Sequence, residues 1–168
     1  MIFSLKGKTA IVTGGGSGIG KAISKTFAKQ GAHICILDFN EENGNTTVSE
    51  IKKENGSASF YQCDVANQNQ IEEIFNAISK NNSIDILINN AGMQHRSQLE
   101  DFPPEMFEQL LRTNVSSVFN VSQVTAKHMI KRGSGKIINI ASVQTLLARP
   151  GIAPYTATKG AVGNLTKG

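Results

Sequence analysis

The sequence predicts an α/β protein built on a doubly wound parallel sheet. Short apolar runs alternate with segments of helical length, several of these runs are almost continuously apolar, and a glycine-rich loop joins the first run to the first helical segment. Continuous apolar runs are typical of strands that helices cover on both faces. Alternating strands and helices imply right-handed crossovers between parallel strands. We expect a single domain over residues 1–168, because this length suits one core.

Five segments are expected to form the strands of this sheet. In chain order they are Lys8–Thr13, Ala32–Asp38, Ala58–Cys63, Ile84–Asn89 and Lys136–Ser142. The third has the weakest apolar pattern, whereas the first, fourth and fifth are almost continuously apolar. We therefore expect these three strands to be covered on both faces.

Two amphipathic segments are expected to form helices between the early strands. Gly18–Gln30 and Asn67–Lys80 each place their apolar residues on one helical face. These are Ile19, Ala22, Ile23, Phe27 and Ala28 in the first segment, and Ile71, Ile74, Phe75 and Ile78 in the second. Apolar residues at this spacing form a stripe that packs against a sheet.

The second half of the chain predicts further helices and an early end. Pro103–Arg132 is expected to form two helices that are broken near Thr113 and Asn114. Another helix begins at Pro154, and the sequence reaches Gly168 after about four turns of it. A complete doubly wound enzyme usually continues beyond this point. We therefore expect a domain that is truncated after the fifth strand and the start of the following helix, and so incomplete at its C-terminus.

The charge and hydropathy patterns exclude two classes of protein. The net charge is +4, but the lysines are scattered along predicted helices, as at Lys21, Lys25 and Lys29. Such scattering is typical of solvated helix faces, so we expect no nucleic-acid partner. The sequence has no window of 18 uncharged apolar residues, and its N-terminus has no apolar run of signal-peptide length. We therefore expect no membrane segment and a cytoplasmic protein.

The cysteines and histidines do not form a metal-binding pattern. Cys35 and Cys63 lie in apolar, strand-like segments, and neither belongs to a CxxC pair. They are interpreted as two buried, reduced thiols. His33, His95 and His128 are far apart and lack the spacing of metal ligands, so no metal site is expected.

The loop Thr13–Gly20 has the sequence TGGGSGIG and lies between the first strand and the first helix. Glycines let the backbone turn sharply and approach a pyrophosphate without collisions from Cβ atoms. The helix N-terminus then offers free N–H groups and a partial positive charge to the anion. A Walker A loop is excluded, because Lys21 follows Gly20 and is itself followed by Ala22. The loop therefore predicts an NAD(P)-binding Rossmann domain.

Asp38 ends the second predicted strand, 18 residues after Gly20. A carboxylate at this place accepts hydrogen bonds from the adenosine ribose hydroxyls and repels a 2′-phosphate. The glycine loop contains no Arg or Lys that could bind such a phosphate, since Ser17 precedes Gly18. This pattern favours NAD over NADP as the cofactor. The alternative is that Asp38 only caps the next helix.

Six elements of the sequence, in this order, resemble the short-chain dehydrogenase/reductase family of the classical type. They are TGxxxGxG at Thr13–Gly20, Asp64-Val65, NNAG at Asn89–Gly92, Asn114, Ser142, and YxxxK at Tyr155–Lys159. Each element alone has low specificity, but their order and spacing together are specific. The resemblance covers essentially the whole chain. It implies an oxidoreductase that transfers a hydride between a nicotinamide cofactor and a secondary alcohol or ketone.

The resemblance also implies a set of cofactor-binding residues. Asp64 and Val65 would contact the adenine, and Asn89–Gly92 would support the floor of the cofactor site. The expected set is Gly14, Ser17, Gly18, Ile19, Gly20, Asp38, Asp64, Val65, Asn90, Ala91, Gly92, Tyr155 and Lys159.

Four residues form the expected catalytic set. Tyr155 and Lys159 are four residues apart, so they share one face of a helix. Tyrosine is a poor base at neutral pH unless cations favour its phenolate, as the Lys159 ammonium and the nicotinamide ring would. Tyr155 could then exchange a proton with the substrate, and Ser142, at the carboxyl end of a strand, could hydrogen-bond the reacting oxygen. By resemblance, Lys159 also holds the nicotinamide ribose, and Asn114 breaks its helix and holds a water linked to Lys159.

Two segments are most similar to gluconate 5-dehydrogenases within the family. They are NNAGMQHRS at Asn89–Ser97 and the run Ala141–Lys159. This likeness implies a sugar acid such as gluconate or 5-ketogluconate as substrate. A sugar acid needs a cation for its carboxylate, and Arg96 and Arg149 are candidates because both flank the predicted pocket. The alternative for each is an exposed loop arginine.

Other functions remain open at this point. Within the same class, the alternatives are a 3-oxoacyl reductase or another sugar or polyol dehydrogenase. In another class, the chain would be an inactive nucleotide-binding fragment. The resemblance implies that the Tyr155–Lys159 helix continues well past Lys159 and builds a subunit interface with the preceding helix, and that two further strands and a substrate lid follow. The full-length enzyme is expected to be a homo-oligomer. We expect the 168-residue chain alone to be weakly stable or inactive.

Overall fold

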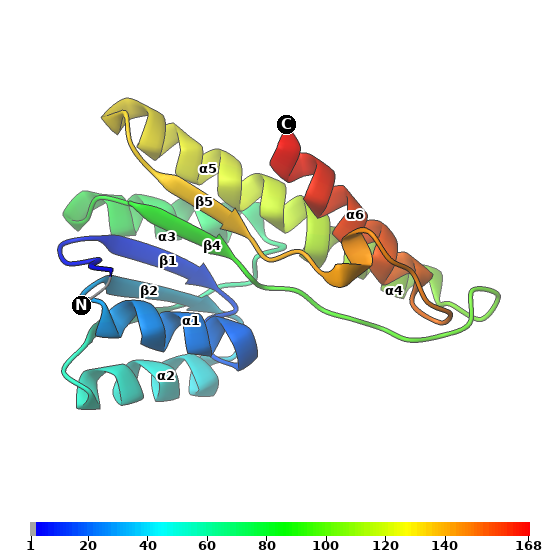
Figure 1. The fold of residues 1–168 in the computed structure, drawn as a ribbon, viewed down its shortest axis with the longest axis horizontal. Helices are drawn as coiled ribbons and strands as arrows, with labels where there is room; N and C mark the ends of the chain where they lie inside the picture. The colour runs from blue at the N-terminus through cyan, green and yellow to red at the C-terminus, as the bar shows by residue number, and fades with distance from the viewer. Residues whose placement is uncertain (1–2) are drawn as a thin grey trace.

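The computed structural model describes residues 3–168, apart from the side chain of residue 81, and contains a five-stranded parallel sheet (Figure 1). The strands are β1 Thr9–Thr13, β2 His33–Asp38, β3 Ser57–Gln62, β4 Ile86–Asn89 and β5 Lys136–Asn139. Their order in the sheet is β3-β2-β1-β4-β5, and every neighbouring pair is parallel. The order reverses between β1 and β4, so the crevice at their carboxyl ends is where such sheets bind ligands. The predicted doubly wound Rossmann fold is confirmed.

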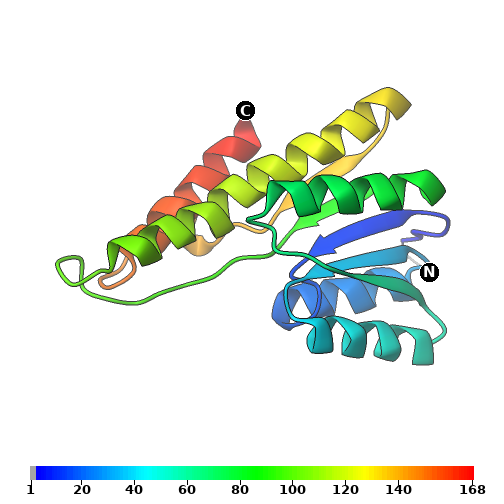
Figure 2. The same ribbon diagram turned by 180° about the vertical axis from the view of Figure 1, so that it is seen from behind.

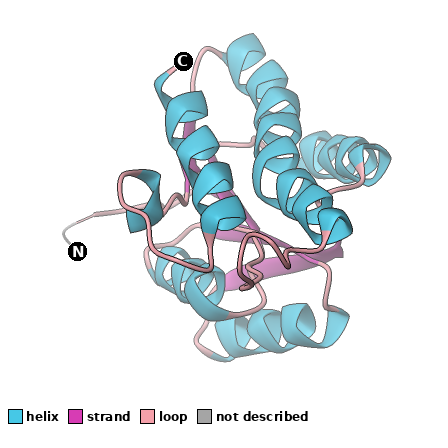
Figure 3. Cartoon of the chain, turned by 90° about the vertical axis from the view of Figure 1, so that its right-hand side faces the viewer, coloured by secondary structure: helices cyan, strands magenta, loops and turns pink. Residues whose placement is uncertain are grey.

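Helices cover both faces of this sheet (Figures 1 and 2). Their bounds are α1 Gly18–Lys29, α2 Glu41–Lys53, α3 Gln68–Asn81, α4 Pro104–Leu111, α5 Ser117–Arg132 and α6 Ala153–Lys167. Helices α1 and α2 lie on one face, and α3 and α5 lie on the other. Figure 3, which views the molecule from the right-hand side of Figure 1, shows α6 beside α5 with helices on both sides of the sheet. Helices α4 and α6 extend beyond the carboxyl ends of the strands (Figure 1).

Two hydrophobic clusters hold these layers together, one on each face. The first joins β1, β2 and β4 to α3 and α5, with Phe75 at its centre and fully buried. The second joins the same strands to α1 and α2, and includes Ile34, Ile36 and Ile51. Strand β1 is buried along its whole length, as predicted for a strand covered on both faces.

The predicted apolar face of α1 is only partly correct. Ile19 is 63% exposed, and the residues of α1 that are buried are Gly20, Ser24 and Ala28. These small residues stand four apart, so they line one face of the helix and let it approach the sheet closely. Ile19 lies in the first turn and lines the pocket at the carboxyl edge instead. On α3, by contrast, Ile71, Phe75 and Ile78 of the predicted face are buried.

Two further expectations differ from the structure, and one helix was not predicted. Strand β5 lies at the edge of the sheet and ends at Asn139, and Ile138 on it is 44% exposed, so it is not covered on both faces. The expected break near Thr113-Asn114 is instead a π-helical turn, η1, over Arg112–Ser116, which joins α4 to α5 without leaving helical geometry. The sequence pattern also missed α2, whose helical face has only two buried apolar residues, Val48 and Ile51.

None of the helices between residues 3 and 168 combines the length and the apolar character that a membrane span requires.

Candidate functional site

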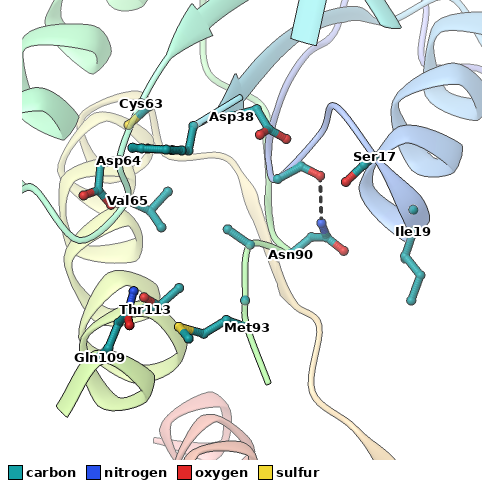
Figure 4. A pocket seen from close by; sticks show the side chains of 15 residues that line it. Ser17, Ile19, Asp38, Cys63, Asp64, Val65, Asn90, Met93, Gln109 and Thr113 are labelled. Carbon is teal, nitrogen blue, oxygen red and sulfur yellow. Dashed lines mark hydrogen bonds between the residues drawn. The ribbon is translucent and has the colours of Figure 1, made fainter. Parts of the chain in front are cut away.

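A pocket of about 610 Å³ opens at the carboxyl ends of β1, β2 and β4 (Figure 4). Its lining residues are Gly14, Ser17, Gly18, Ile19, Asp38, Phe39, Cys63, Asp64, Val65, Asn90, Ala91, Gly92, Met93, Gln109 and Thr113. In Figure 4, Ser17 and Ile19 lie on one side, and Asp64 and Val65 lie opposite. This is the crevice in which an open parallel sheet binds its ligand.

The glycine loop forms one wall of this pocket. Gly14 and Gly18 have positive φ values of 62° and 50°, which favour glycine. A Cβ on Gly20 would overlap with the carbonyl oxygen of Gly14 and come within 2.5 Å of the Asn90 side-chain amide. The N-terminus of α1 therefore packs directly on the loop, with its first N–H groups at the pocket wall. This arrangement suits the pyrophosphate of a dinucleotide.

The segment that begins at Asn90 is locked to the end of β1. The hydroxyl of Thr13 accepts hydrogen bonds from the backbone N–H groups of Asn90 and Ala91, both at 3.0 Å. The Asn90 amide in turn donates to the carbonyl oxygens of Thr13 at 3.0 Å and Gly14 at 3.1 Å, and Figure 4 draws the second of these bonds. The glycine loop and the NNAG motif thus form one rigid wall.

Asp38 is held at the mouth of the pocket by two backbone hydrogen bonds. Its Oδ2 accepts from the N–H of Gly16 at 2.8 Å, and its Oδ1 accepts from the N–H of Asn40 at 3.0 Å. Helix α2 is capped by Asn40, whose side chain accepts from the N–H of Asn43 at 2.8 Å. The helix-cap role that was the alternative for Asp38 therefore belongs to Asn40, and Asp38 is part of the pocket lining.

The two cysteines are buried, free thiols, as predicted. Cys63 lines the pocket from the end of β3, while Cys35 lies within the sheet. Burial raises the pKa of each thiol to about 12. Between residues 3 and 168, no three His, Cys, Asp or Glu side chains lie close enough to hold a metal ion.

Lys159 and Tyr155 lie on α6 and are not part of the pocket lining. The Lys159 side chain is buried and donates a hydrogen bond to the carbonyl oxygen of Ile140 at 2.8 Å. Its Nζ is 5.8 Å from the centre of the Tyr155 ring. Burial lowers the pKa of the Lys159 ammonium. A Cβ on Gly92 would lie 3.8 Å from Lys159 Nζ, so the lysine adjoins the pocket floor.

Asn114 joins three parts of the site. Its Oδ1 accepts from the N–H of Met93 at 2.8 Å, and its Nδ2 donates to the carbonyl oxygen of Met93 at 2.9 Å and to Thr158 Oγ1 at 3.1 Å. Asn114 is buried in the π-helical turn. Its side chain therefore holds the pocket floor against α6.

Ser142 follows β5 and caps a short 3-10 turn, η2, over Val143–Thr145. Its hydroxyl accepts from the N–H of Gln144 at 3.2 Å. This turn packs on α6, where Thr145 Oγ1 donates to the carbonyl oxygen of Lys159 at 3.2 Å. The turn therefore fixes Ser142 relative to the helix that carries Tyr155.

Comparison with known protein families agrees with the fold and the glycine-loop pocket described above. Residues 8–168 match the family model described as "short chain dehydrogenase". The chain belongs to the short-chain dehydrogenase family.

Two similar members of this family are named for reactions of sugar acids. The chain is 49% identical to a gluconate 5-dehydrogenase of Gluconobacter oxydans, over 99% of this chain and 66% of that protein. It is 42% identical to a 2-dehydro-3-deoxy-D-gluconate 5-dehydrogenase of Bacillus subtilis, over 98% of this chain and 65% of that protein. The chain thus spans about two thirds of the length of these curated relatives.

A solved structure of the family shares this fold. It is a gluconate 5-dehydrogenase from Burkholderia cenocepacia in complex with NADP and tartrate, 47% identical to this chain. The TM-score is 0.92, over 98% of this chain and 65% of that chain. The cofactor that this relative binds is a nicotinamide dinucleotide, which agrees with the expected cofactor class. Because it is NADP, the comparison does not support the expected preference for NAD.

Most residues that the short-chain dehydrogenase motifs predicted meet in the pocket. The pocket lining contains every expected cofactor residue except Gly20, Tyr155 and Lys159. Sequence reasoning missed Phe39, Cys63, Met93, Gln109 and Thr113. Phe39 and Cys63 directly follow the last residues of β2 and β3, a position that could have indicated them. Gln109 and Thr113 lie on α4 and η1, and nothing in the sequence indicates that this end of the helix reaches the pocket.

A second, smaller pocket of about 350 Å³ lies between two loops of the chain, one that follows β4 and one that precedes α6. Its lining residues are Arg96, Ser97, Gln98, Arg149, Pro150, Gly151 and Ile152. The N–H of Ser97 donates to the carbonyl oxygen of Gly151 at 3.2 Å, which ties the two loops together. The structure therefore brings the two candidate arginines, Arg96 and Arg149, into one pocket. Among residues 3–168, the salt bridges do not involve either of them.

Proposed function

We propose that the protein that contains this chain is an NAD(P)-dependent oxidoreductase of sugar acids, which interconverts gluconate and 5-ketogluconate. The observation that carries this proposal is that Lys159, whose Nζ is 5.8 Å from the centre of the Tyr155 ring, adjoins Gly92 in the lining of the glycine-loop pocket. The pocket offers a dinucleotide a helix N-terminus, a ribose-facing carboxylate and an apolar floor. The names of the relatives described above support a sugar acid as the substrate class.

In the proposed reaction the chain's own groups handle the proton. The phenolate of Tyr155 takes the proton from the C5 hydroxyl of gluconate as the carbonyl forms, and returns it in the reverse direction. A nicotinamide bound in the glycine-loop pocket would supply the hydride chemistry, as acceptor of the C5 hydride in oxidation and as its donor in reduction. The Lys159 ammonium stabilises the phenolate, and the Ser142 hydroxyl orients the reacting oxygen. Since burial lowers the pKa of Lys159, this ammonium loses its charge at a lower pH than an exposed lysine does.

Arg96 and Arg149 are the proposed partners of the substrate carboxylate. Guanidinium groups bind carboxylates through two parallel hydrogen bonds, and these two arginines share a pocket without a carboxylate in its lining. Ile152 of that pocket is three residues before Tyr155, which is about one helical turn. The arginine pocket therefore adjoins the start of the helix that carries Tyr155.

The substrate proposal predicts that substitution of Arg96 or Arg149 lowers kcat/KM for a negatively charged substrate more than for an uncharged one. Arg149→Ala should lower kcat/KM for gluconate by about 10- to 100-fold, because a charge-assisted pair contributes about 1.5–3 kcal/mol. The uncharged polyol glucitol should lose less than about threefold. Lys131→Ala, an exposed charge at the end of α5, is the matched control. Unchanged gluconate kinetics in Arg149→Ala would remove Arg149 from the substrate site.

NAD is the cofactor that we propose on the basis of Asp38. Its carboxylate is fixed at the pocket mouth by Gly16 and Asn40, where it would accept from the ribose hydroxyls and repel a 2′-phosphate. The NADP complex of the Burkholderia relative is the observation against this proposal. The test is kcat/KM with each cofactor, in the native protein and in Asp38→Asn. A native preference for NADP, or an unchanged ratio in Asp38→Asn, contradicts the proposed role of the carboxylate.

The activity itself is tested by following NADH and NADPH absorbance with gluconate, glucitol and a 3-oxoacyl substrate. Oxidation of gluconate above the others supports the proposal. A preference for the 3-oxoacyl substrate supports the alternative reductase, which the relatives described above do not favour. Cofactor binding without turnover of any substrate supports the other class, a nucleotide-binding protein. The same assay tests the expectation that the 168-residue chain by itself is inactive.

A further inference from the structure

The turn η2 connects Ser142 rigidly to Thr145. The N–H of Thr145 donates to the carbonyl oxygen of Ser142 at 3.0 Å, and the N–H of Gln144 donates to the Ser142 hydroxyl at 3.2 Å. Both bonds close within four residues, so the turn moves as one unit. A displacement of Thr145 therefore displaces Ser142.

Thr145 contacts two residues of α6 that share one face of the helix. Its Oγ1 donates to the carbonyl oxygen of Lys159 at 3.2 Å. Its γ-methyl group lies against Gly163, and a Cβ on residue 163 would overlap with that methyl group. Lys159 and Gly163 are four residues apart, so both face the turn. Because residue 163 is a glycine, η2 packs closer to α6 than it could against a residue that carries a Cβ.

The same segment also holds the other end of Lys159. The Lys159 ammonium donates to the carbonyl oxygen of Ile140 at 2.8 Å, two residues before Ser142. The backbone oxygen of Lys159 accepts from Thr145, three residues after Ser142. Ser142 therefore lies, along the chain, between Ile140 and Thr145, which both hydrogen-bond to Lys159. The contact between Thr145 and Gly163 determines how closely the turn η2 approaches α6 when these bonds form.

A second glycine of α6 provides the comparison. Gly160 has no atom within 4 Å of the place where a Cβ would stand. Glycine is unfavourable in the interior of a helix, so packing is needed to explain its presence. The close contact with Thr145 explains the glycine at position 163, whereas no close contact explains the glycine at position 160.

We propose that Thr145 and Gly163 form a positioning pair that sets the distance between Ser142 and the Tyr155–Lys159 pair. This inference rests on the proposed function, because it assigns the pair a role in a catalytic site. The two residues act through Ser142 and Lys159 and do not touch substrate themselves. An alanine at position 163 would force the turn outward, and a misplacement of about 1 Å can lower a rate by about 100-fold.

The test is a set of four variants in the protein. Gly163→Ala should lower kcat with gluconate by about 10- to 100-fold and leave KM for the cofactor within about twofold, since the glycine loop is not involved. Gly160→Ala, the same change in open space, should leave kcat within about twofold. Thr145→Ser keeps the hydroxyl and removes the methyl group. Combined with Gly163→Ala, it should restore kcat to within about threefold of native.

Two results would overturn the positioning role: native kcat in Gly163→Ala, or no recovery in the double variant. If Gly163→Ala unfolds, Thr145→Val replaces it as the test, because valine keeps the shape and loses only the bond to Lys159. It should lower kcat by about 3- to 10-fold with KM for the cofactor unchanged, and native kcat would contradict the role.

A readout without turnover separates this inference from the proposed function. The backbone amide resonance of Ser142 should shift in Gly163→Ala, return in the double variant and stay in place in Gly160→Ala. If gluconate is not oxidised but these shifts occur, the proposed function is wrong and the coupling stands. If gluconate is oxidised but the Ser142 resonance does not respond, the coupling is wrong.

Discussion

The Cα atom of Gly20 lies so close to the carbonyl oxygen of Gly14 that residue 20 has no room for a Cβ. This contact seats the N-terminus of α1 on the glycine loop and against the Asn90 amide. Gly20→Ala would push these parts about 1 Å or more away from each other, because non-bonded heavy atoms need about 3.5–4 Å.

We therefore expect Gly20→Ala to weaken cofactor binding by more than about tenfold, since the N–H groups that would face the pyrophosphate move away. Titration of NADH and NADPH fluorescence measures this. Gly160→Ala, where the new methyl group meets open space, should bind both cofactors as the native protein does. Native affinity in Gly20→Ala would show that the loop does not bind the cofactor.

The two cysteines should not react in the native protein. Burial raises the pKa of Cys35 and Cys63 to about 12, so at pH 8 only about one thiol in 10⁴ is a thiolate, and neither side chain is accessible. We expect Ellman's reagent to label both only after denaturant is added. Fast labelling of either thiol in the native protein would contradict the burial of that residue.

Asp85 should be the carboxylate on which stability depends most. It is buried, accepts from the N–H of Thr9 at 2.9 Å, and forms ion pairs with Lys8 at 3.2 Å and Arg132 at 3.0 Å. Burial alone would raise its pKa, but the hydrogen bonds and the Arg132 charge outweigh burial and lower it. Asp85 therefore contributes fully to the free energy of unfolding at pH values above the usual pKa of an aspartate. This contribution is lost as the pH falls through the lowered pKa of the folded protein.

We expect Asp85→Ala to lower the free energy of unfolding by about 3 kcal/mol at pH 7, because it leaves two cations and a backbone N–H without their partner. Denaturant unfolding at pH 7 and pH 3 measures this, with the exposed Asp101→Ala as the control. The difference from native should shrink at pH 3. A loss at pH 7 that equals that of the control would contradict the role of Asp85.

Glu50 on α2 bridges Lys21 at 2.7 Å and Lys25 at 2.9 Å on α1. Hydrogen bonds from both lysines lower the pKa of Glu50 to about 2. This contact is therefore complete above pH 4.5, the usual value, and is lost as the pH falls towards about 2. Because the three side chains are still about a third exposed to solvent, we expect Glu50→Gln to lower Tm by only about 1–3 °C at low salt. Thermal unfolding at 0.5 M salt should remove most of that difference, and a salt-independent loss would contradict an electrostatic origin.

The sheet could be predicted from the sequence because parallel strands carry their own signal. Ile34 and Ile36 belong to a continuous apolar run, and such runs need no partner to be recognised. The apolar face of α1 could not be predicted in the same way. Hydropathy assigns Ile19 to the core, but the packing distance between α1 and the sheet requires small residues such as Gly20 and Ser24 on the buried face. The distance between α1 and the sheet depends on tertiary packing, which the hydropathy pattern of one helix does not reveal.

In the candidate site, too, residues within one motif could be predicted from the sequence, whereas contacts between separate elements could not. Motifs with fixed spacing, such as Tyr155–Lys159, indicate their partners because one helix carries both. The contact of Thr113 with the pocket and the meeting of Arg96 with Arg149 depend on how separate loops and helices cross. Asn114 was expected to break its helix, yet the structure absorbs it in a π-helical turn. A π-turn adds one residue to a turn of helix and leaves no mark in hydropathy.

The contact between Gly16 and Asp38 constrains how cofactor choice could change in evolution or in design. A Cβ on Gly16 would lie 2.9 Å from Asp38 Oδ2, so the first position that a larger loop residue could occupy is already filled by the carboxylate. Enlarging residue 16 while Asp38 remains would disturb the carboxylate, and removing Asp38 alone would leave the N–H of Gly16 without its acceptor. A larger residue at position 16 therefore requires a change at position 38 as well, so we expect the two positions to vary together.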